Sequence, residues 1–166
     1  SGTKEVAEHL TIEVSNLQPW IDEFVPGAGK INSIEQFKGG QSNPTYKIVT
    51  ESKNLVLRRK PPGKLLPSAH AVDREYKVIT ALYQTDVPVP KTYGLCENDE
   101  IAGTAFFVMD FLDGDLFWNP MIPSLSNQDR TEIYQNKNKT LALLHGVDYK
   151  KIGLEDYGKP GNYVAR

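Results

Sequence analysis

The run Gly39-Gly40-Gln41-Ser42-Asn43 has the composition of a loop that could hold phosphate. Glycine adopts backbone conformations that other residues avoid, so the N–H groups of such a loop can come close to phosphate oxygens. Ser42 and Asn43 add short side chains that can form hydrogen bonds. The run matches neither of the two common glycine-rich phosphate-binding patterns. On these residues alone, a plain hairpin turn is the favoured interpretation.

The segment 54–59 adds a cation to this chemistry. In an extended strand, Leu55, Leu57 and Arg59 face one side, whereas Val56 and Arg58 face the other. Val56 could contact a base while Arg58 binds phosphates, because arginine keeps its charge and binds phosphate through two N–H groups. The alternative is that Arg58 ends an edge strand in solvent.

Glu75 is the carboxylate that could hold Arg58 in place. It precedes Tyr76, at the border of the apolar stripe of a predicted helix, from which it could reach across to a cation on the strand. An ordinary solvated glutamate is the alternative. On these residues alone, the solvated glutamate is the favoured interpretation.

The apolar segment 104–111 runs directly into Leu112-Asp113-Gly114-Asp115. A strand that leaves its sheet exposes unpaired N–H and C=O groups beside an apolar surface, which suits the edge of a purine. The acidic residues Asp110, Asp113 and Asp115 lack the spacing of a calcium-binding loop. A solvated hinge is therefore favoured over a metal site, and no metal site is predicted in the chain.

The run His145-Gly146-Val147-Asp148 resembles the His-Gly-Asp that opens a catalytic loop, with one residue inserted. It lies at the end of a predicted amphipathic helix, where histidine and glycine are ordinary terminal residues. We assign it no catalytic role.

Hydrophobic periodicity predicts the elements that must position these residues. Short turns between neighbouring strands imply antiparallel pairing, so the predicted fold class is α+β, with a five-stranded antiparallel sheet and one packed helix. The expected order is a helix at 15–25, strands at 31–37, 45–50 and 54–59, a helix at 68–84, strands at 91–96 and 104–111, a linker at 112–125 and a helix at 126–145.

Capping residues support two of these helices. Ser15 is the expected cap of the first helix, and Pro19 fits only near its start. Ser126 and Asp129 form the expected capping box of the last helix, which Gly146 ends.

Composition narrows the class of protein. The 166 residues are 39% hydrophobic and 24% charged, which is typical of a globular protein. The net charge of -2 shows no excess of basic residues of the kind that binds nucleic acid. The single cysteine, Cys96, excludes an intrachain disulfide and a cysteine-based zinc site, and a small buried hydrophobe is its favoured role. No bilayer-spanning run or signal peptide is visible, so we expect no membrane contact and an intracellular, cytoplasmic location. Ser1-Gly2 resembles a tag remnant, and residues 1–14 are assigned to an N-terminal segment that precedes the predicted lobe.

Several sequence blocks occur in a fixed order: Gly39 to Tyr46, Leu57-Arg58-Arg59-Lys60-Pro61-Pro62-Gly63, Arg74-Glu75-Tyr76, Val87-Pro88-Val89-Pro90 and Phe107-Val108-Met109-Asp110-Phe111. Together they resemble the aminoglycoside-phosphotransferase-like family, which has a kinase-like fold. Lys64 to Val72 and Gly153 to Tyr163 are similar to the branch fused to, or encoded near, acyl-CoA dehydrogenases. The resemblance covers about residues 15–166.

The resemblance implies an N-lobe at 15–111, a hinge at 112–125 and the start of a second lobe at 126–166. It also implies nucleotide-binding roles: Gly39, Gly40, Gln41, Ser42 and Asn43 over the ATP phosphates, Val56 at the base, Arg58 in place of the usual phosphate-binding lysine, Glu75 as its ion-pair partner, Met109 at the back of the adenine pocket, and the Asp110 carbonyl and Leu112 N–H at the adenine edge.

The implied activity is ATP-dependent phosphoryl transfer, with Mg²⁺, to a hydroxyl of a small molecule. The acyl-CoA dehydrogenase association favours a hydroxyacyl or hydroxyacyl-CoA acceptor. The catalytic aspartate and the Mg²⁺ ligands of such enzymes belong to the second lobe, so we expect this chain to be an inactive fragment without catalytic residues. The alternatives are a non-catalytic, pseudokinase-like nucleotide-binding or interaction module and a structural fragment of a larger assembly.

Self-association is also expected, because Ile133, Leu141, Leu143 and Leu144 lie on more than one face of the last helix.

Overall fold

The chain folds as two compact units, residues 1–77 with 90–115 and residues 78–89 with 116–166. The computed structural model describes residues 2–38, 43–63, 71–158 and 161. Its elements are β1 (Thr3–Lys4), a 3-10 turn (Glu8–Leu10), α1 (Val14–Phe24), β2 (Ile31–Phe37), β3 (Thr45–Thr50), β4 (Asn54–Arg59), α2 (Val72–Leu82), β5 (Thr92–Cys96), α3 (Asp99–Ala102), β6 (Phe106–Asp110) and α4 (Asn127–His145).

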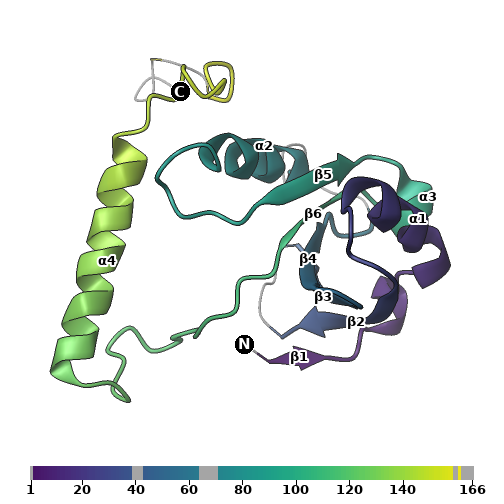
Figure 1. The fold of residues 1–166 in the computed structure, drawn as a ribbon, viewed down its shortest axis with the longest axis horizontal. Helices are drawn as coiled ribbons and strands as arrows, with labels where there is room; N and C mark the ends of the chain where they lie inside the picture. The colour runs from purple at the N-terminus through teal and green to yellow at the C-terminus, as the bar shows by residue number, and fades with distance from the viewer. Residues whose placement is uncertain (1, 39–42, 64–70, 159–160, 162–166) are drawn as a thin grey trace. The chain divides into compact units, whose positions relative to one another are not determined.

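The first unit is built on an antiparallel sheet with the strand order β1-β2-β3-β4-β6-β5 (Figure 1). This confirms the predicted α+β class, and five strands lie within two residues of their predicted bounds. The prediction of five strands was wrong, because β1 adds a sixth. Thr3 pairs with Phe37 and Lys4 with Gln36, so residues of the N-terminal segment, for which no strand was predicted, extend the sheet. A two-residue strand carries no periodicity, and only its backbone partner reveals it.

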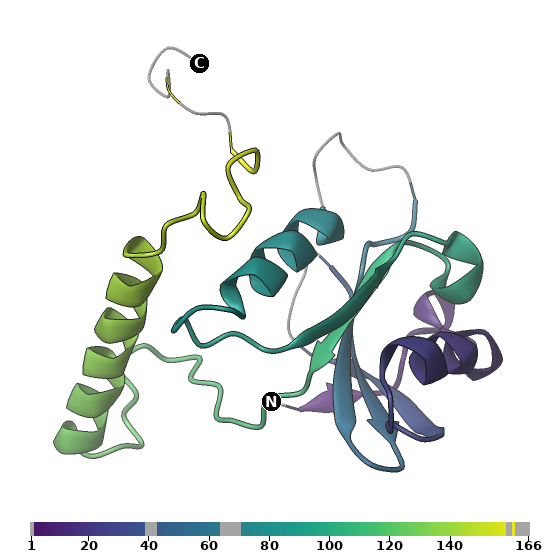
Figure 2. The ribbon, with the colours of Figure 1, turned by 45° about the horizontal axis from the view of Figure 1, so that its top comes forward.

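A continuous apolar core lies between the sheet and α1, which covers one of its faces (Figure 2). Leu17, Trp20 and Ile21 are the buried residues of the helix. The ring of Trp20 stacks on Phe24 at 4.6 Å between centroids and meets the edge of Phe106 at 5.0 Å. The sheet supplies Tyr46, Ile48, Leu55, Leu57, Phe106 and Val108, and Cys96 is buried there as predicted.

The start of α1 differs from its prediction. Glu13, not Ser15, occupies the N-cap position, and no side chain caps the helix. Pro19 lies in the interior of the helix rather than near its start. An interior proline costs about 3 kcal/mol because it removes a backbone hydrogen bond. Burial of Leu17, Trp20 and Ile21, at roughly 1.5–3 kcal/mol each, offsets that cost.

Two further segments differ in detail. Between the strands predicted at 91–96 and 104–111, the chain forms the one-turn helix α3, where the Asn98 side chain accepts a hydrogen bond from the Glu100 N–H. Gly103 ends α3 with φ of 80°, a conformation that favours glycine. The helix predicted at 68–84 spans Val72–Leu82 within the described residues.

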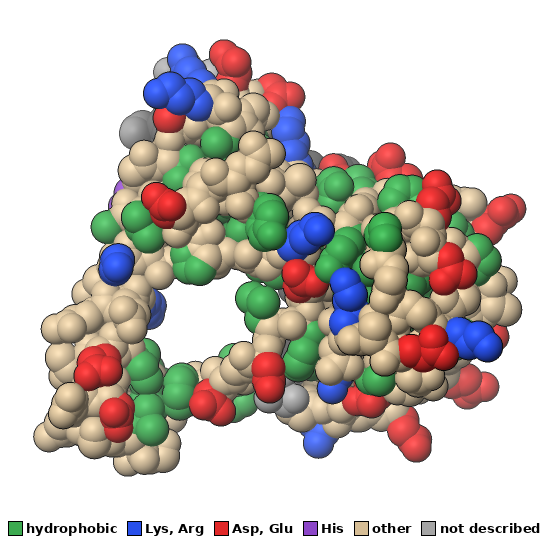
Figure 3. Space-filling model, viewed as in Figure 1, with side chains coloured by type: hydrophobic (Ala, Val, Ile, Leu, Met, Phe, Trp, Pro, Cys, Tyr) green, Lys and Arg blue, Asp and Glu red, His purple; other side chains and the backbone are tan. Residues whose placement is uncertain are grey.

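The second unit contains α4, and the predicted pairing of Ser126 with Asp129 at its start is confirmed, although the Asp129 carboxylate bonds the Ser126 hydroxyl rather than the Ser126 backbone N–H of a full capping box. Ser126 Oγ accepts from the Asp129 N–H at 3.1 Å and donates to the Asp129 carboxylate at 2.7 Å. No residue of α4 is buried, and Figure 3 shows apolar side chains where the helix begins and on the segment before it. Met121 is 72% exposed and Tyr134 is 42% exposed. Of the four residues from which self-association was predicted, Leu141 and Leu144 are exposed, at 49% and 43%. Self-association itself stays a prediction. Among the described residues, no helix is both long and apolar enough to cross a bilayer.

Candidate nucleotide-binding site

The alternation predicted for β4 is confirmed. Leu55, Leu57 and Arg59 are at most 3% exposed and face the core beneath α1. Arg58 is on the opposite face, where it pairs across the sheet with Thr45 on β3 and Phe107 on β6. Strand geometry therefore separates two adjacent arginines onto the two sides of the sheet.

The predicted ion pair between Arg58 and Glu75 is present. Arg58 Nε donates to Glu75 Oε2, and Arg58 Nη2 donates to Glu75 Oε1 at 3.2 Å. The two side chains are 28% and 35% exposed, so the pair is partly shielded but accessible to a ligand. Glu75 lies in the first turn of α2, whose Tyr76 ring packs 6.0 Å from the Phe107 ring. That aromatic contact fixes the side of α2 that faces the sheet.

Two residues complete a closed ring of hydrogen bonds around this pair. Asn43 Nδ2 donates to Glu75 Oε1 at 2.9 Å, and the Asn43 side chain is almost fully enclosed. Arg58 Nη1 donates to Thr45 Oγ1 at 3.1 Å, and that hydroxyl donates to the Asn43 carbonyl at 3.1 Å. Sequence reasoning missed Thr45. Its position as the first residue of β3, opposite Arg58, is a signal that becomes visible only when the register is known.

An apolar surface continues from this ring toward the end of β6. Val56 is 7% exposed and lies between Lys47 on β3 and Met109 on β6 in the sheet register. The Lys47 Nζ lies 5.0 Å from the centroid of the Phe111 ring. Phe111 in turn stacks on Phe37 at 6.3 Å. Val56, Met109 and Arg58 thus share one face, as their proposed roles require.

The end of β6 is anchored through the Asp110 side chain. Its Oδ1 accepts from the Tyr93 hydroxyl at 2.6 Å, and that hydroxyl accepts from Lys53 Nζ at 3.3 Å. The Asp110 N–H donates to the Lys91 carbonyl at 2.9 Å. Leu112, two residues further on, is 64% exposed. The carboxylate of Asp110 is thus used for structure, and the adenine contacts of the Asp110 carbonyl and Leu112 N–H stay predictions.

The remaining predicted site residues Gly39, Gly40, Gln41 and Ser42 lie outside the described residues. No group of three or more histidine, cysteine, aspartate or glutamate side chains within the described part of the chain could hold a metal ion.

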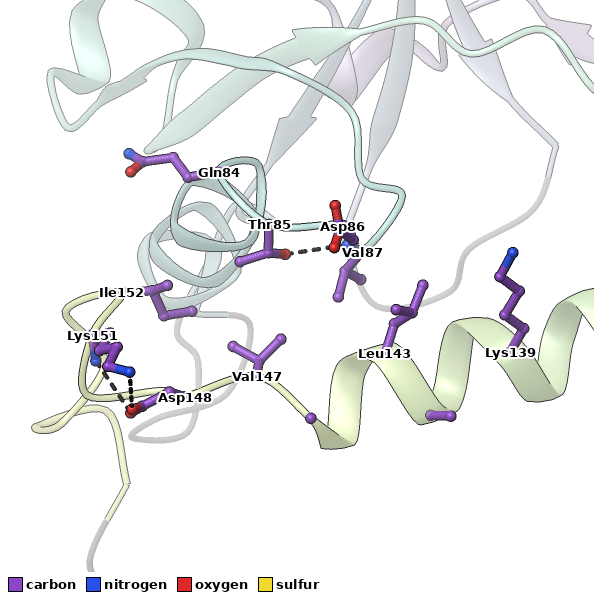
Figure 4. A pocket seen from close by; sticks show the side chains of 12 residues that line it. Gln84, Thr85, Asp86, Val87, Lys139, Leu143, Val147, Asp148, Lys151 and Ile152 are labelled. Carbon is purple, nitrogen blue, oxygen red and sulfur yellow. Dashed lines mark hydrogen bonds and ion pairs between the residues drawn. The ribbon is translucent and has the colours of Figure 1, made fainter.

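The segment after α4 behaves as a structural turn. Asp148 accepts hydrogen bonds from the N–H groups of Lys150 and Lys151 and forms an ion pair with the Lys151 side chain at 3.4 Å (Figure 4). These bonds, with the Lys151 N–H first among them, lower the pKa of the Asp148 carboxyl below its usual value. Figure 4 also shows Val87, Leu143 and Val147 around the adjoining hollow of about 610 Å³. Asp148 therefore caps a turn, and the absence of a catalytic role for this run stays a prediction.

The chain is similar to parts of curated acyl-CoA dehydrogenase family proteins. The chain is 44% identical over 167 residues to acyl-CoA dehydrogenase family member 10 of Mus musculus, covering 99% of this chain and 16% of that protein. It is 39% identical over 168 residues to acyl-CoA dehydrogenase family member 11 of Rattus norvegicus, covering 99% and 22%. The chain thus spans about a fifth of the length of these curated relatives.

A solved structure matches the fold. A Ralstonia eutropha JMP134 protein, provisionally named an aminoglycoside phosphotransferase, is 46% identical and superposes with a TM-score of 0.80 over 94% of this chain and 45% of its own. The model of the phosphotransferase enzyme family (APH) matches residues 33–166, which include every predicted site residue. The chain belongs to the phosphotransferase enzyme family.

Proposed function

We propose that this chain forms the nucleotide-holding part of an ATP-dependent phosphotransferase. The observation that carries the proposal is the Arg58 guanidinium, held by Glu75 on the sheet face that also bears Val56 and Met109. An oriented cation beside an apolar strip matches the two halves of a nucleotide, a charged phosphate chain and a flat base.

Arg58 retains capacity to bind phosphate while it is held. A guanidinium has five N–H donors. Its bonds to Glu75 and Thr45 use one hydrogen on each of the three nitrogens. The second hydrogen on Nη1 and the second on Nη2 can donate to phosphate oxygens. Because phosphoryl transfer depends mainly on positioning and charge neutralisation, an arginine fixed in this way supplies the contribution expected of this lobe.

The proposed acceptor is a hydroxyl group of a small molecule. The names of the relatives concern acyl-CoA dehydrogenases, which favours a hydroxyacyl compound or its coenzyme A thioester. The proposed cofactors are ATP and the Mg²⁺ that usually binds with it, which would neutralise charge on the phosphates. The described residues offer no cluster for a metal ion, so we assign no step to one.

The test compares ATP with adenosine on the Arg58→Ala variant. Loss of a charge-assisted phosphate contact, worth roughly 1.5–3 kcal/mol, should weaken ATP binding about tenfold or more. Adenosine has no phosphates, so its affinity should hardly change. Isothermal calorimetry or ligand-detected NMR on both ligands measures this. The matched control is Arg130→Ala, which removes the same side chain from α4 in the second unit.

Two outcomes would contradict the proposal. Equal losses for ATP and adenosine would mean that Arg58 supports the fold rather than binding phosphate. If the unsubstituted chain bound neither ligand, the alternative of a pseudokinase-like interaction module would be favoured.

A further inference from the structure

The Asn43 carboxamide has a role that its place beside a glycine-rich run does not indicate. It is 2% exposed, and its Nδ2 donates to Glu75 Oε1 at 2.9 Å. The same oxygen accepts from Arg58 Nη2, and the other carboxylate oxygen accepts from Arg58 Nε. The amide is therefore an additional donor on a carboxylate that already binds an arginine.

We propose that Asn43 is a positioning residue, which fixes the Glu75 carboxylate and, through it, the Arg58 guanidinium. The inference rests on the proposed nucleotide-binding function and deepens it. Because Thr45 Oγ1 links Arg58 to the Asn43 carbonyl, both the backbone and the side chain of Asn43 belong to the ring. The start of β3, the end of β4 and the first turn of α2 are thereby tied at a single residue.

The physical reason lies in the entropy of long side chains. Partly exposed ion pairs contribute little because two flexible side chains must be held in one geometry. Arg58 and Glu75 are both long and both partly exposed. A short, enclosed amide loses little freedom, and its bond to Glu75 removes rotamers that would release Arg58. Asparagine suits this position because a carboxylate acceptor needs a donor opposite it.

The variant Asn43→Asp keeps the shape and replaces the donor with an acceptor. Two carboxylates in hydrogen-bond contact do not readily ionise together. Arg58 faces them from β4, and Asp73, Arg74 and Lys77 flank Glu75 along α2. Below the pH at which the pair gives up its shared proton, an O–H···O bond replaces the amide bond. Above that pH, repulsion breaks the contact.

ATP affinity of Asn43→Asp, measured relative to the unsubstituted chain, should be reduced about tenfold at about pH 8 and should recover toward parity near pH 5. Dividing the ATP affinity of the variant by that of the unsubstituted chain at the same pH removes the effect of the nucleotide's own titration. The double variant Asn43→Asp, Glu75→Gln exchanges the amide and the carboxylate and keeps the net charge of the unsubstituted chain. The double variant should bind ATP more tightly than the single variant at about pH 8. Its ATP affinity relative to the unsubstituted chain should be nearly independent of pH.

Thermal melting of the same three proteins separates this proposal from the nucleotide proposal. The melting-temperature deficit of Asn43→Asp should shrink toward low pH and should be smaller in the double variant, whether or not ATP binds. If the single variant does not fold at about pH 8, recovery of folding in the double variant supports the contact and continued failure overturns it. The proposal would be overturned if the losses of ATP affinity and melting temperature in Asn43→Asp were independent of pH and were not reduced by Glu75→Gln. It would also be overturned if Asn43→Asp lowered neither quantity.

Discussion

Two adjacent arginines on β4 mark the difference between the two faces of the sheet. Arg58 is partly exposed and bound to a carboxylate. Arg59 is 3% exposed and donates instead to two backbone carbonyls, that of Ala102 at 2.5 Å and that of Leu10 at 3.0 Å. Its guanidinium lies 5.2 Å from the centroid of the Tyr46 ring. One arginine is accessible to a ligand, whereas the other is enclosed by the fold.

The comparison shows that residue type alone does not reveal the role of a charge. Burial lowers the pKa of Arg59, and Tyr46 partly opposes this. Its bonds connect β4 to the segment before α1 and to the end of α3, three pieces that are distant in sequence. Arg59 Nε has no hydrogen-bond partner within the described part of the chain. Arg59 therefore acts as a structural residue, at the cost of burying a charge.

Replacement of each arginine by methionine tests this comparison most strongly. Arg59→Met leaves the carbonyls of Ala102 and Leu10 without these donors, so we expect the free energy of unfolding to fall by about 3 kcal/mol. Arg58→Met removes a partly exposed ion pair and should cost at most about 1 kcal/mol. Urea denaturation followed by circular dichroism measures both. Similar losses for the two variants would remove the distinction between the faces.

Close packing under α1 gives a second test. A Cβ added at Gly94 would lie 3.0 Å from Phe24 Cδ1 and 3.0 Å from Trp20 Cζ2. Gly94→Ala should therefore displace α1 and destabilise the protein by roughly 1–3 kcal/mol. Gly114→Ala is the control, because no described heavy atom lies within 4 Å of that position. Urea denaturation and tryptophan fluorescence should change for Gly94→Ala alone, and an unchanged Gly94→Ala would indicate a loosely packed face.

Alkaline pH should weaken the enclosed face through Tyr46. Burial raises the pKa of Tyr46 from 10.0, with Arg59 opposing, and its hydroxyl donates to the Leu10 carbonyl at 3.0 Å. The folded protein therefore keeps this proton when the unfolded chain loses it. The resulting stability is present below about pH 10 and is lost as the pH rises above it, by at most about 1.4 kcal/mol per pH unit. Unfolding free energies at about pH 8 and about pH 10.5 should differ less in Tyr46→Phe. The same slope in both proteins would exclude this role.

The smallest expected effect concerns Thr45 on the accessible face. Thr45→Val keeps the shape but removes the hydroxyl that accepts from Arg58 Nη1. The donor is a charged guanidinium, but it is partly exposed and remains bound to Glu75, so we expect the lost contact to cost only about 1 kcal/mol. ATP affinity should then fall about fivefold, with little change for adenosine. Thr45→Ser retains the hydroxyl and should bind ATP nearly as well as the unsubstituted chain. Calorimetry on the three proteins decides this, and equal affinities would show that Glu75 alone holds Arg58.

The sequence by itself determined the features that depend on local periodicity. Alternation along 55–59 assigned the two arginines to opposite faces, and this alternation together with the family resemblance predicted the ion pair between Arg58 and Glu75. The helix cap at Ser126 and five strand positions followed from patterns within a few residues. Side-chain direction in a strand or helix is set by backbone geometry, so these features could be predicted without knowledge of the fold.

Only the tertiary structure decided the features that depend on distant partners. β1 exists because β2 offers it an edge, and β6 lies between β4 and β5 although it follows both in sequence. Pro19 is accommodated in α1 because the core beneath it is extensive. The enclosure of Arg59 and the contact of Asn43 with Glu75 likewise join residues 32 or more positions apart. Such contacts depend on the register of the strands and the placement of the helices, which local propensity does not encode.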